Sequence, residues 1–307
     1  MEKKKVNVGG QAVIEGVMIR GIHNYVVAVR KDKKIVTKKG QIPHKKHKFL
    51  KWPFVRGSVN LVEMLIIGMK SLMWSAEQVG GEEEKLGKNE LLVTVLVSIG
   101  FVILFFVALP YFLTSLFGFI EEEKPVLFNI VDGIIRIVIF LIYIVAISFM
   151  EDVKRVFQYH GAEHKAIHCY EHGEKINIEN VKKFTTLHPR CGTSFLLIVF
   201  VVSIFVFSLL PSIILLYSPS FLELNVWIRR GILFPLRILL LPVIAGVSYE
   251  ILKISDKHQK NLLFKIISTP GLLLQKITTK EPDEKQIEVA IASLKSLLEI
   301  ESKNKKK

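Results

Sequence analysis

Four long apolar runs dominate the middle of this 307-residue chain, at residues 91–120, 127–150, 194–217 and 228–250. A helix needs about 20 apolar residues to cross a hydrocarbon core of about 30 Å, so each run is long enough to span a bilayer. The first run exceeds this length and contains Pro110, which predicts a kink or an interfacial end. The pattern predicts a mainly α-helical, multi-pass membrane protein with about four transmembrane helices.

The beginning of the chain follows a different pattern, which predicts a small α+β domain at 1–90. Short apolar pairs separated by glycines within residues 8–21 indicate strands or loops with tight turns. Residues 25–30 and 35–37 flank a charged tetrapeptide, as in a β-hairpin. Across residues 55–78, apolar side chains recur at three- and four-residue spacing. We expect an amphipathic helix there, packed on the membrane surface, on the transmembrane bundle or inside the domain.

The remaining segments complete the predicted domain division. Residues 91–250 form the transmembrane region, with a loop at 151–193, and residues 251–307 form a C-terminal region. An apolar stretch around Pro270 is too short to span and is expected at the membrane interface. A helix predicted after Glu281 has an apolar face that could dock on the N-terminal domain. That face comprises Ile287, Ile291, Leu294, Leu297 and Leu298.

Composition and charge place these segments relative to the membrane. The chain is 50% hydrophobic with a net charge of +14, and its mean hydropathy of +0.39 is too high for an ordinary soluble domain. Lysine and arginine are concentrated in 1–90, 151–193 and 251–307 and nearly absent from 121–126 and 218–228. By the positive-inside rule, both termini and the loop lie in the cytoplasm. The same rule accounts for the positive charge, so we expect membrane lipids and no nucleic acid as partners.

Three ionisable residues lie within the predicted spans. Asp132 and Arg136 are four positions apart on one helix face, where they can form an ion pair. Arg237 lies between two prolines of the fourth run. Charges inside a membrane are costly and usually face a bundle interior or a water-filled cavity. Either the Asp132–Arg136 pair locks helices together, or Arg237 contacts an anion or a lipid headgroup.

The candidate chemistry is concentrated in residues 159–173 and 187–192, which contain five of the nine histidines and both cysteines. Residues 150–172 are expected to extend the second transmembrane helix into the cytoplasm, with Gly173 as its stop. On such a helix one stripe holds His160, His164, His168 and Glu171. Imidazoles at i and i+4 can bind one divalent ion together.

Glu163 lies beside this stripe and suits a third ligand, a group that orients a ligand, or a general base. Together with His160 and His164 it matches the H-x-x-E-H pattern, in which the glutamate activates a metal-bound water. Only three positions of that pattern are fixed, and nothing else in the chain indicates a soluble peptidase of that class.

A second segment supplies further candidate ligands. His188 and Cys191 lie in a turn before the third span and could close a tetrahedral site with His160 and His164. This N/S donor set predicts a divalent transition metal, with zinc the favoured ion. Four protein ligands would make a closed structural site, whereas three plus water would make an open catalytic one. Arg190 could hold a phosphate or carboxylate, or extend to the lipid headgroups.

Three motifs, taken together and in order, make the chain resemble a known family. They are Gly9-Gly-Gln-Ala-Val-Ile-Glu-Gly-Val-Met-Ile-Arg-Gly21, Tyr159-His-Gly-Ala-Glu-His-Lys165 and Leu187-His-Pro-Arg-Cys-Gly-Thr-Ser-Phe195. The resemblance is to the bacterial YqhQ-like family and covers nearly the whole chain. That family is a domain of unknown function described as predicted metal-dependent enzymes, so the resemblance implies a multi-pass protein of the bacterial cell membrane with a metal role. The motif residues that carry over are His160, Glu163, His164, His188, Cys191, Gln11, Glu15 and Arg20, whereas His168 and His172 lie outside the motifs.

The first motif can contribute to the same site. Gln11, Glu15 and Arg20 are polar residues in a glycine-framed segment, as expected where backbone approaches a ligand closely. We expect this segment to cover the site, with Glu15 as an additional ligand or base and with Gln11 and Arg20 as binding groups. The alternative is a structural turn with a local ion pair between Glu15 and Arg20.

Three functional hypotheses follow from the sequence. The first is a membrane-embedded metal-dependent hydrolase that acts at the cytoplasmic face on a membrane-proximal or lipid-linked substrate, with Glu163, Glu15 and Arg190 as catalytic residues. The second is a non-catalytic metal-binding scaffold or sensor, which a closed four-ligand site would favour. The third is a transporter, and four spans without a detectable repeat speak against it.

Overall fold

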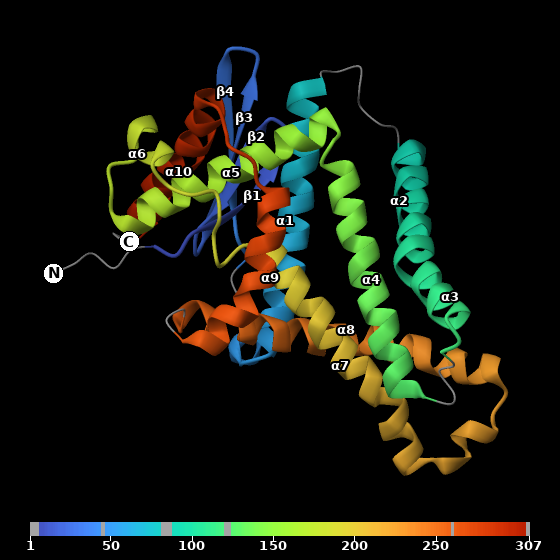
Figure 1. Ribbon diagram of the computed structural model, residues 1–307. Helices are drawn as coiled ribbons and strands as arrows, with labels where there is room; N and C mark the ends of the chain where they lie inside the picture. The colour runs from blue at the N-terminus through green and yellow to red at the C-terminus, as the bar shows by residue number, and fades with distance from the viewer. Residues whose placement is uncertain (1–5, 44–46, 81–87, 120–123, 259–260, 305–307) are drawn as a thin grey trace.

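The computed structural model describes residues 6–43, 47–80, 88–119, 124–258 and 261–304. Within these residues the chain is mainly α-helical, with one four-stranded sheet near the N-terminus (Figure 1). The predicted combination of a helical majority with a small N-terminal α+β part is therefore confirmed.

The sheet is an antiparallel meander whose strands pair in sequence order. The strands are β1 (Gly9–Val13), β2 (Gly16–Arg20), β3 (Asn24–Lys31) and β4 (Lys34–Gln41). The predicted hairpin is confirmed, since Val29 pairs with Val36 across β3 and β4. The glycine-rich segment before it forms a second hairpin, in which Val13 pairs with Gly16.

Helices cover both faces of the sheet. α1 (Val55–Gly80) packs on one face, where its Ile67 joins Met18 and Val27 in a buried cluster. The other face is covered by α5 (Glu151–His172) and α10 (Glu284–Asn304), with the short α6 (Ile178–Lys182) beside them (Figure 1). Since β2 and β3 are buried on both sides, their sequences are continuously apolar rather than alternating.

One hydrophobic core joins three distant segments of the chain. It contains Val17 and Val26 from the sheet, Tyr159 from α5 and Leu294 from α10. Ser293 of α10 also donates a hydrogen bond to the Val26 carbonyl (2.9 Å). The predicted docking of the C-terminal helix on the N-terminal domain is therefore confirmed.

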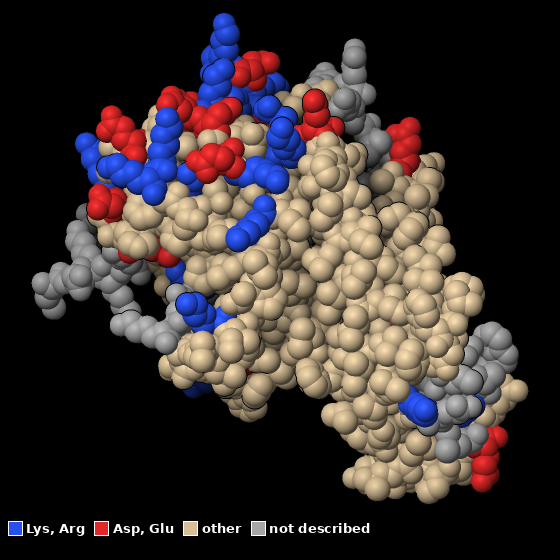
Figure 2. Space-filling view, in the orientation of Figure 1, with Lys and Arg blue, Asp and Glu red and all other residues tan. Residues whose placement is uncertain are grey.

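Five helices among the described residues are long and apolar enough to cross a membrane. One of them is formed by α2 (Lys88–Ile103), which continues through a π-helical turn (Leu104–Ala108) into α3 (Leu109–Leu116). The other four are α1, α4 (Pro125–Ile147), α7 (Gly192–Tyr217) and α8 (Val226–Lys257). The surface over α2, α3, α4 and α7 is almost free of charge, whereas charged side chains gather over the sheet and its helices (Figure 2). The count exceeds the four predicted runs because α1 also meets the criteria of length and hydropathy.

The second apolar run and the histidine-rich helix are not one continuous helix, contrary to the prediction. α4 ends at Ile147, Met150 adopts an extended backbone and α5 begins at Glu151. Acidic residues in the first turn, Glu151 and Asp152, favour this new helix start. The break lets α5 turn across the end of α4 and run along the sheet (Figure 1). The predicted stop at Gly173 is confirmed, since its φ of 80° is left-handed.

α9 (Leu262–Thr278) contains the short apolar stretch around Pro270. It packs closely against α7, because a Cβ added at Gly271 would lie 2.4 Å from the Ser194 hydroxyl oxygen. Its position at a membrane interface stays a prediction. Short 3-10 helices lie at Lys48–Lys51 and Pro219–Glu223.

Replacing Leu294 with alanine should destabilise the shared core. The side chain is fully buried, and such truncations cost about 2–5 kcal/mol because they leave a cavity. Thermal unfolding of the detergent-solubilised protein, followed by circular dichroism, should show a lower midpoint for Leu294→Ala than for wild type. Lys295→Ala, at the next and exposed position, is the control and should leave the midpoint unchanged. Equal midpoints for all three proteins would contradict the packing of α10 described above.

Candidate metal centre

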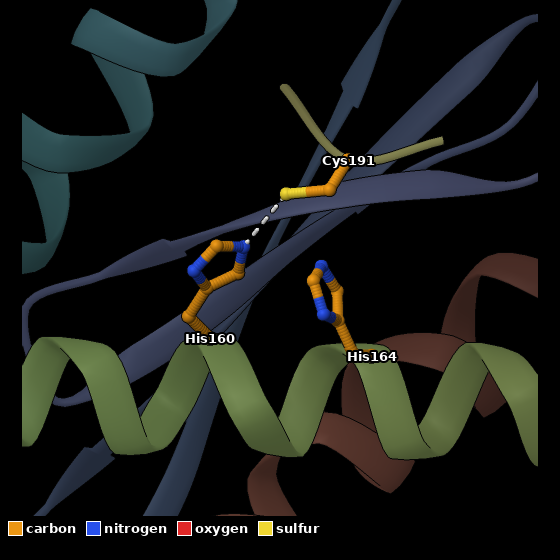
Figure 3. A group of neighbouring side chains, drawn as sticks. All are labelled: His160, His164 and Cys191. Carbon is orange, nitrogen blue, oxygen red and sulfur yellow. Dashed lines mark hydrogen bonds between the residues drawn. The ribbon is translucent and has the colours of Figure 1, made fainter. Parts of the chain in front are cut away.

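Two histidines of α5 and a cysteine that precedes α7 converge on one point (Figure 3). The rings of His160 and His164 extend from the same face of α5 toward Cys191. His160 Nε2 lies 3.2 Å from Cys191 Sγ, and one potential ligand atom from each residue lies within 4.8 Å of the other two. The structure thus brings together three of the four residues predicted as metal ligands.

Backbone carbonyls set the orientation of both rings. His160 Nδ1 lies 2.9 Å from the Thr278 carbonyl oxygen, and His164 Nδ1 lies 2.5 Å from the Thr186 carbonyl oxygen. A carbonyl oxygen only accepts hydrogen bonds, so both Nδ1 atoms carry a proton and both Nε2 atoms present a lone pair. Metal-binding histidines usually donate their second ring N–H in this way. Sequence reasoning missed these two supports because any residue type can supply a backbone carbonyl.

Gln275 of α9 holds the loop that carries the cysteine. Its side chain accepts a hydrogen bond from the His188 N–H (2.7 Å) and donates to the His188 carbonyl (2.8 Å) and to Ser194 Oγ (2.9 Å). Cys191 is the N-cap residue of α7, where the helix dipole favours a negatively charged ligand. The position of Cys191 therefore depends on the packing of α7 against α9.

His188 joins a different cluster from the one predicted. Its Nε2 lies 3.2 Å from Glu171 Oε2, and its Nδ1 accepts a hydrogen bond from the Arg190 N–H (3.2 Å). Both of its ring nitrogens are thus engaged away from Cys191. The physical reason is the hold that Gln275 has on the His188 backbone, which turns the imidazole toward Glu171.

His168, Glu171 and His188 also place potential ligand atoms within 4.8 Å of one another. In this group, however, His168 Nε2 donates to the Leu187 carbonyl (2.8 Å), and Arg190 forms an ion pair with Glu171. Burial disfavours the charged form of Glu171, but the His188 hydrogen bond and the Arg190 charge outweigh it and hold the pKa of this carboxyl below its usual range. The Arg190 guanidinium already neutralises the Glu171 carboxylate. We therefore interpret His168, Glu171 and His188 as a support for the loop that carries Cys191 rather than as a second metal site.

Glu163 lies beside the first cluster and is almost completely buried. Its Oε2 is 3.4 Å from His164 Nε2, and among the described ion pairs none joins Glu163 to a lysine or arginine. Burial raises the pKa of Glu163 and lowers that of His164, which favours the neutral form of each. A divalent cation held by the two imidazoles would supply the positive charge that this carboxyl lacks. The residues therefore fit a metal ion.

A cavity of about 370 Å³ adjoins the cluster. Its polar wall includes His160, Glu163, His164, Arg190 and Cys191. Its apolar wall includes Val156 and Phe157 of α5, Ile144 of α4 and Leu196 of α7. Because α4 and α7 are candidate membrane spans, the cavity lies where the sheet and its helices meet the apolar helices.

The three polar residues of the N-terminal motif have separate environments. Gln11 lines the cavity, whereas Arg20 forms an ion pair with Glu63 of α1 (3.4 Å). Glu15 accepts two hydrogen bonds from Arg155 of α5, both 2.5 Å long. The predicted alternative, an ion pair between Glu15 and Arg20, is therefore wrong, because each residue has a partner on a distant helix.

Glu171→Gln should reduce the loss of stability at acidic pH. Because folding lowers the pKa of Glu171 from 4.5, its carboxylate stabilises the protein above that pH, and this contribution is lost as the pH falls through the folded-state pKa. Metal-free wild type should therefore lose more thermal stability than Glu171→Gln between about pH 6 and about pH 3. If both proteins lost the same thermal stability over this pH range, the contacts with His188 and Arg190 would not stabilise the charged carboxyl of Glu171.

Comparison with known proteins gives the family. A family described as "Protein of unknown function (DUF1385)" matches residues 52–300. The "Uncharacterized protein YqhQ" of Bacillus subtilis (strain 168) is 36% identical over 324 residues, which cover 98% of this chain and 96% of that protein. No solved structure matches the chain. The chain therefore belongs to the YqhQ-like family of proteins of unknown function, as its three motifs predicted.

Proposed function

We propose that this protein is a membrane-embedded, metal-dependent hydrolase whose centre is formed by His160, His164 and Cys191. The observation that carries the proposal is that a backbone carbonyl lies at Nδ1 of each histidine while both Nε2 atoms lie close to Cys191 Sγ. Two imidazoles and a thiolate favour zinc among the divalent transition metals. These three protein ligands would leave a fourth position for water or substrate, as in catalytic zinc sites.

Glu163 has the position required of a general base. A bound zinc ion supplies Lewis acidity, which polarises a substrate carbonyl and acidifies water. Glu163 borders both the cluster and the cavity, so its carboxylate takes the proton of the attacking water and passes it to the leaving group. Arg190 lines the same cavity, and Glu171 and Asp256 hold its guanidinium in place. An anionic part of the substrate would contact this guanidinium by displacing one of the two carboxylates.

Glu15 has no chemical step in this proposal. Arg155 and Tyr159 bind its carboxylate, and it is not among the residues that line the cavity. Its φ of 50° lies in the left-handed region, which is unusual for a residue with a side chain. The ion pair with Arg155 holds this turn against α5, so Glu15 positions β1 rather than substrate.

The cavity beside the open position supports catalysis over a closed metal-binding scaffold or sensor. The charges that motivated a transporter have local partners instead. Arg136 donates to Asp132 on the same helix (2.7 Å), and Arg237 of α8 donates to Asn129 of α4 (3.1 Å). Only the second contact joins two helices, and such local pairing supports a structural role for these residues more than a polar path through the bundle.

Packing also restricts how the chain can cross a membrane. The sheet precedes α1, and α5 follows α4, yet the sheet and α5 share one core, so both lie on the same side. The chain must therefore cross the membrane an even number of times between the sheet and α5. Three candidate spans, α1, α2–α3 and α4, lie between them, so one of the three does not cross. We assign α1 as the helix that does not cross, because Ile67 packs against the sheet and its mean hydropathy of 1.2 is the lowest of the five.

With α1 outside the membrane, four helices cross it and both termini lie on the side of the metal centre. The positive-inside rule makes that side the cytoplasm of a bacterial cell. On this proposed topology the cavity, which Ile144 and Leu196 line, lies at the cytoplasmic ends of two spans. The substrate of the proposed hydrolase is accordingly membrane-proximal.

Protein purified without chelators should contain about one zinc or similar transition-metal ion per chain. His160→Ala/His164→Ala should lose the metal, as measured by inductively coupled plasma mass spectrometry, because two of three ligands are gone. His172→Ala is the matched control, since His172 lies on the same helix but is exposed and its Nδ1 bonds to the His168 carbonyl. Wild-type protein without metal, or a double variant that retains it, would rule out this centre.

Surface cysteines test the four-crossing topology. Lys33→Cys in the turn between β3 and β4 and Glu179→Cys in α6 should both react with a membrane-impermeant maleimide from the cytoplasmic face alone. Ser220→Cys, between α7 and α8, should react only from the opposite face. Both native cysteines are buried, and the three substituted positions are exposed. Labelling of Lys33→Cys and Glu179→Cys from opposite faces would mean that α1 crosses.

A further inference from the structure

β1 is an edge strand, and its free edge borders the cavity beside the candidate centre. The sheet order is β1-β2-β3-β4, so among the described strands β1 pairs only with β2. Five consecutive residues, 8–12, line the cavity. Side chains alternate between the two faces of a strand, so an unbroken run of lining residues reaches the cavity through the edge of the strand.

The register of the first hairpin shows which backbone groups point outward. Val13 pairs with Gly16 across a two-residue turn, so this pair exchanges the hydrogen bonds that close the hairpin. Bonded and non-bonded pairs alternate along an antiparallel ladder, so Gly10 and Ala12 direct their N–H and C=O groups away from β2. Among the described residues no hydrogen bond reaches these outward groups.

Gly10 brings this edge into contact with Glu163. A Cβ added at position 10 would lie 2.7 Å from Glu163 Oε1 and 2.6 Å from the Met18 carbonyl oxygen. Because the Met18 oxygen is a backbone atom of the neighbouring strand and cannot swing aside, only glycine fits at position 10, between β2 and the Glu163 side chain of α5. The free edge and the proposed general base therefore share one cavity.

We propose that the substrate is an extended polypeptide segment that adds to β1 as a fifth strand. Its main-chain groups bond to Gly10 and Ala12, the mode by which peptides are recognised at open sheet edges. An extended peptide repeats its outward donors and acceptors about every 6.8 Å, as the edge of β1 does, whereas a lipid headgroup has no such repeat. Ile144 and Leu196 line the same cavity, so the bound segment lies next to the membrane.

The chemical step rests on the proposed hydrolase function. Water adds across a peptide C–N bond: its oxygen bonds to the carbonyl carbon, and the C–N bond breaks. Glu163 takes the proton from the water and delivers it to the leaving nitrogen. No oxidation or reduction takes place, and the products are a carboxylic acid and an amine.

Peptide binding to metal-stripped protein tests the inference apart from hydrolysis. The probe is a fluorescein-labelled ten-residue peptide of alternating leucine and serine with blocked ends, and its binding is followed by fluorescence anisotropy in detergent. Ala12→Pro removes the outward N–H while the ladder bonds of β1 remain, and edge strands tolerate proline at such positions. We expect Ala12→Pro to bind the probe about fivefold more weakly, the effect of one lost hydrogen bond. Ala12→Val, which adds similar bulk but keeps the N–H, should bind as wild type does.

A second arm does not depend on the folding of a variant. N-methylation of alternate residues of the probe removes its donors along one edge, and we expect wild-type protein to bind the methylated peptide about tenfold more weakly. Equal affinity for the two peptides would overturn the proposal. It would also be overturned if a short-chain phosphatidylglycerol displaced the probe and bound Ala12→Pro as tightly as wild type, which would indicate a lipid substrate.

The outcomes separate this inference from the proposed function. Protein that carries one metal ion per chain but does not bind the probe refutes the peptide substrate and leaves the hydrolase standing. Protein that binds the probe with the expected sensitivity at Ala12 but holds no metal supports the peptide site and contradicts the hydrolase.

Discussion

The packing of α5 against the sheet is the constraint on which the rest of the structure depends. Tyr159 is buried in the core that α5 shares with the sheet and α10, and this anchors the helix in one orientation. His160 and His164 are thereby presented to the segment that precedes α7, where Cys191 completes the cluster. The same packing brings together the segments before α1 and after α4. It therefore sets the geometry of the proposed centre and is also the basis of the proposed topology.

Features that depend on local sequence could be predicted. The apolar runs, the hairpin of β3 and β4 and the helix stop at Gly173 follow from composition and spacing over a few residues. The proximity of His160 and His164 follows from their i, i+4 spacing on a helix, a local property that the break after α4 does not disturb. The convergence of Cys191 with these histidines across 31 residues is not a local property, and the sequence offered it only together with His188.

Features that depend on distant partners could not be predicted. The carbonyls of Thr186 and Thr278 orient the two rings, and no side-chain pattern marks them. Gln275 turns His188 toward Glu171 from 87 residues away, so the turn of residues 187–192 alone did not reveal which cluster each ligand joins. Helices cover both faces of the sheet, so the residues around Gly10 do not alternate between apolar and polar as they do in a half-exposed strand. The sequence pattern therefore did not identify β1 as an edge strand, and its free edge became apparent only from the structure.

The coordination of the bound metal tests the central claim most directly. X-ray absorption at the zinc edge of the purified protein should show one sulfur at about 2.3 Å and two imidazole nitrogens at about 2.0–2.1 Å, with one further light ligand. In Cys191→Ser the sulfur contribution should disappear while the imidazole contribution remains. A coordination shell without sulfur in the wild-type protein, or one made of oxygen ligands alone, would contradict a centre formed by His160, His164 and Cys191.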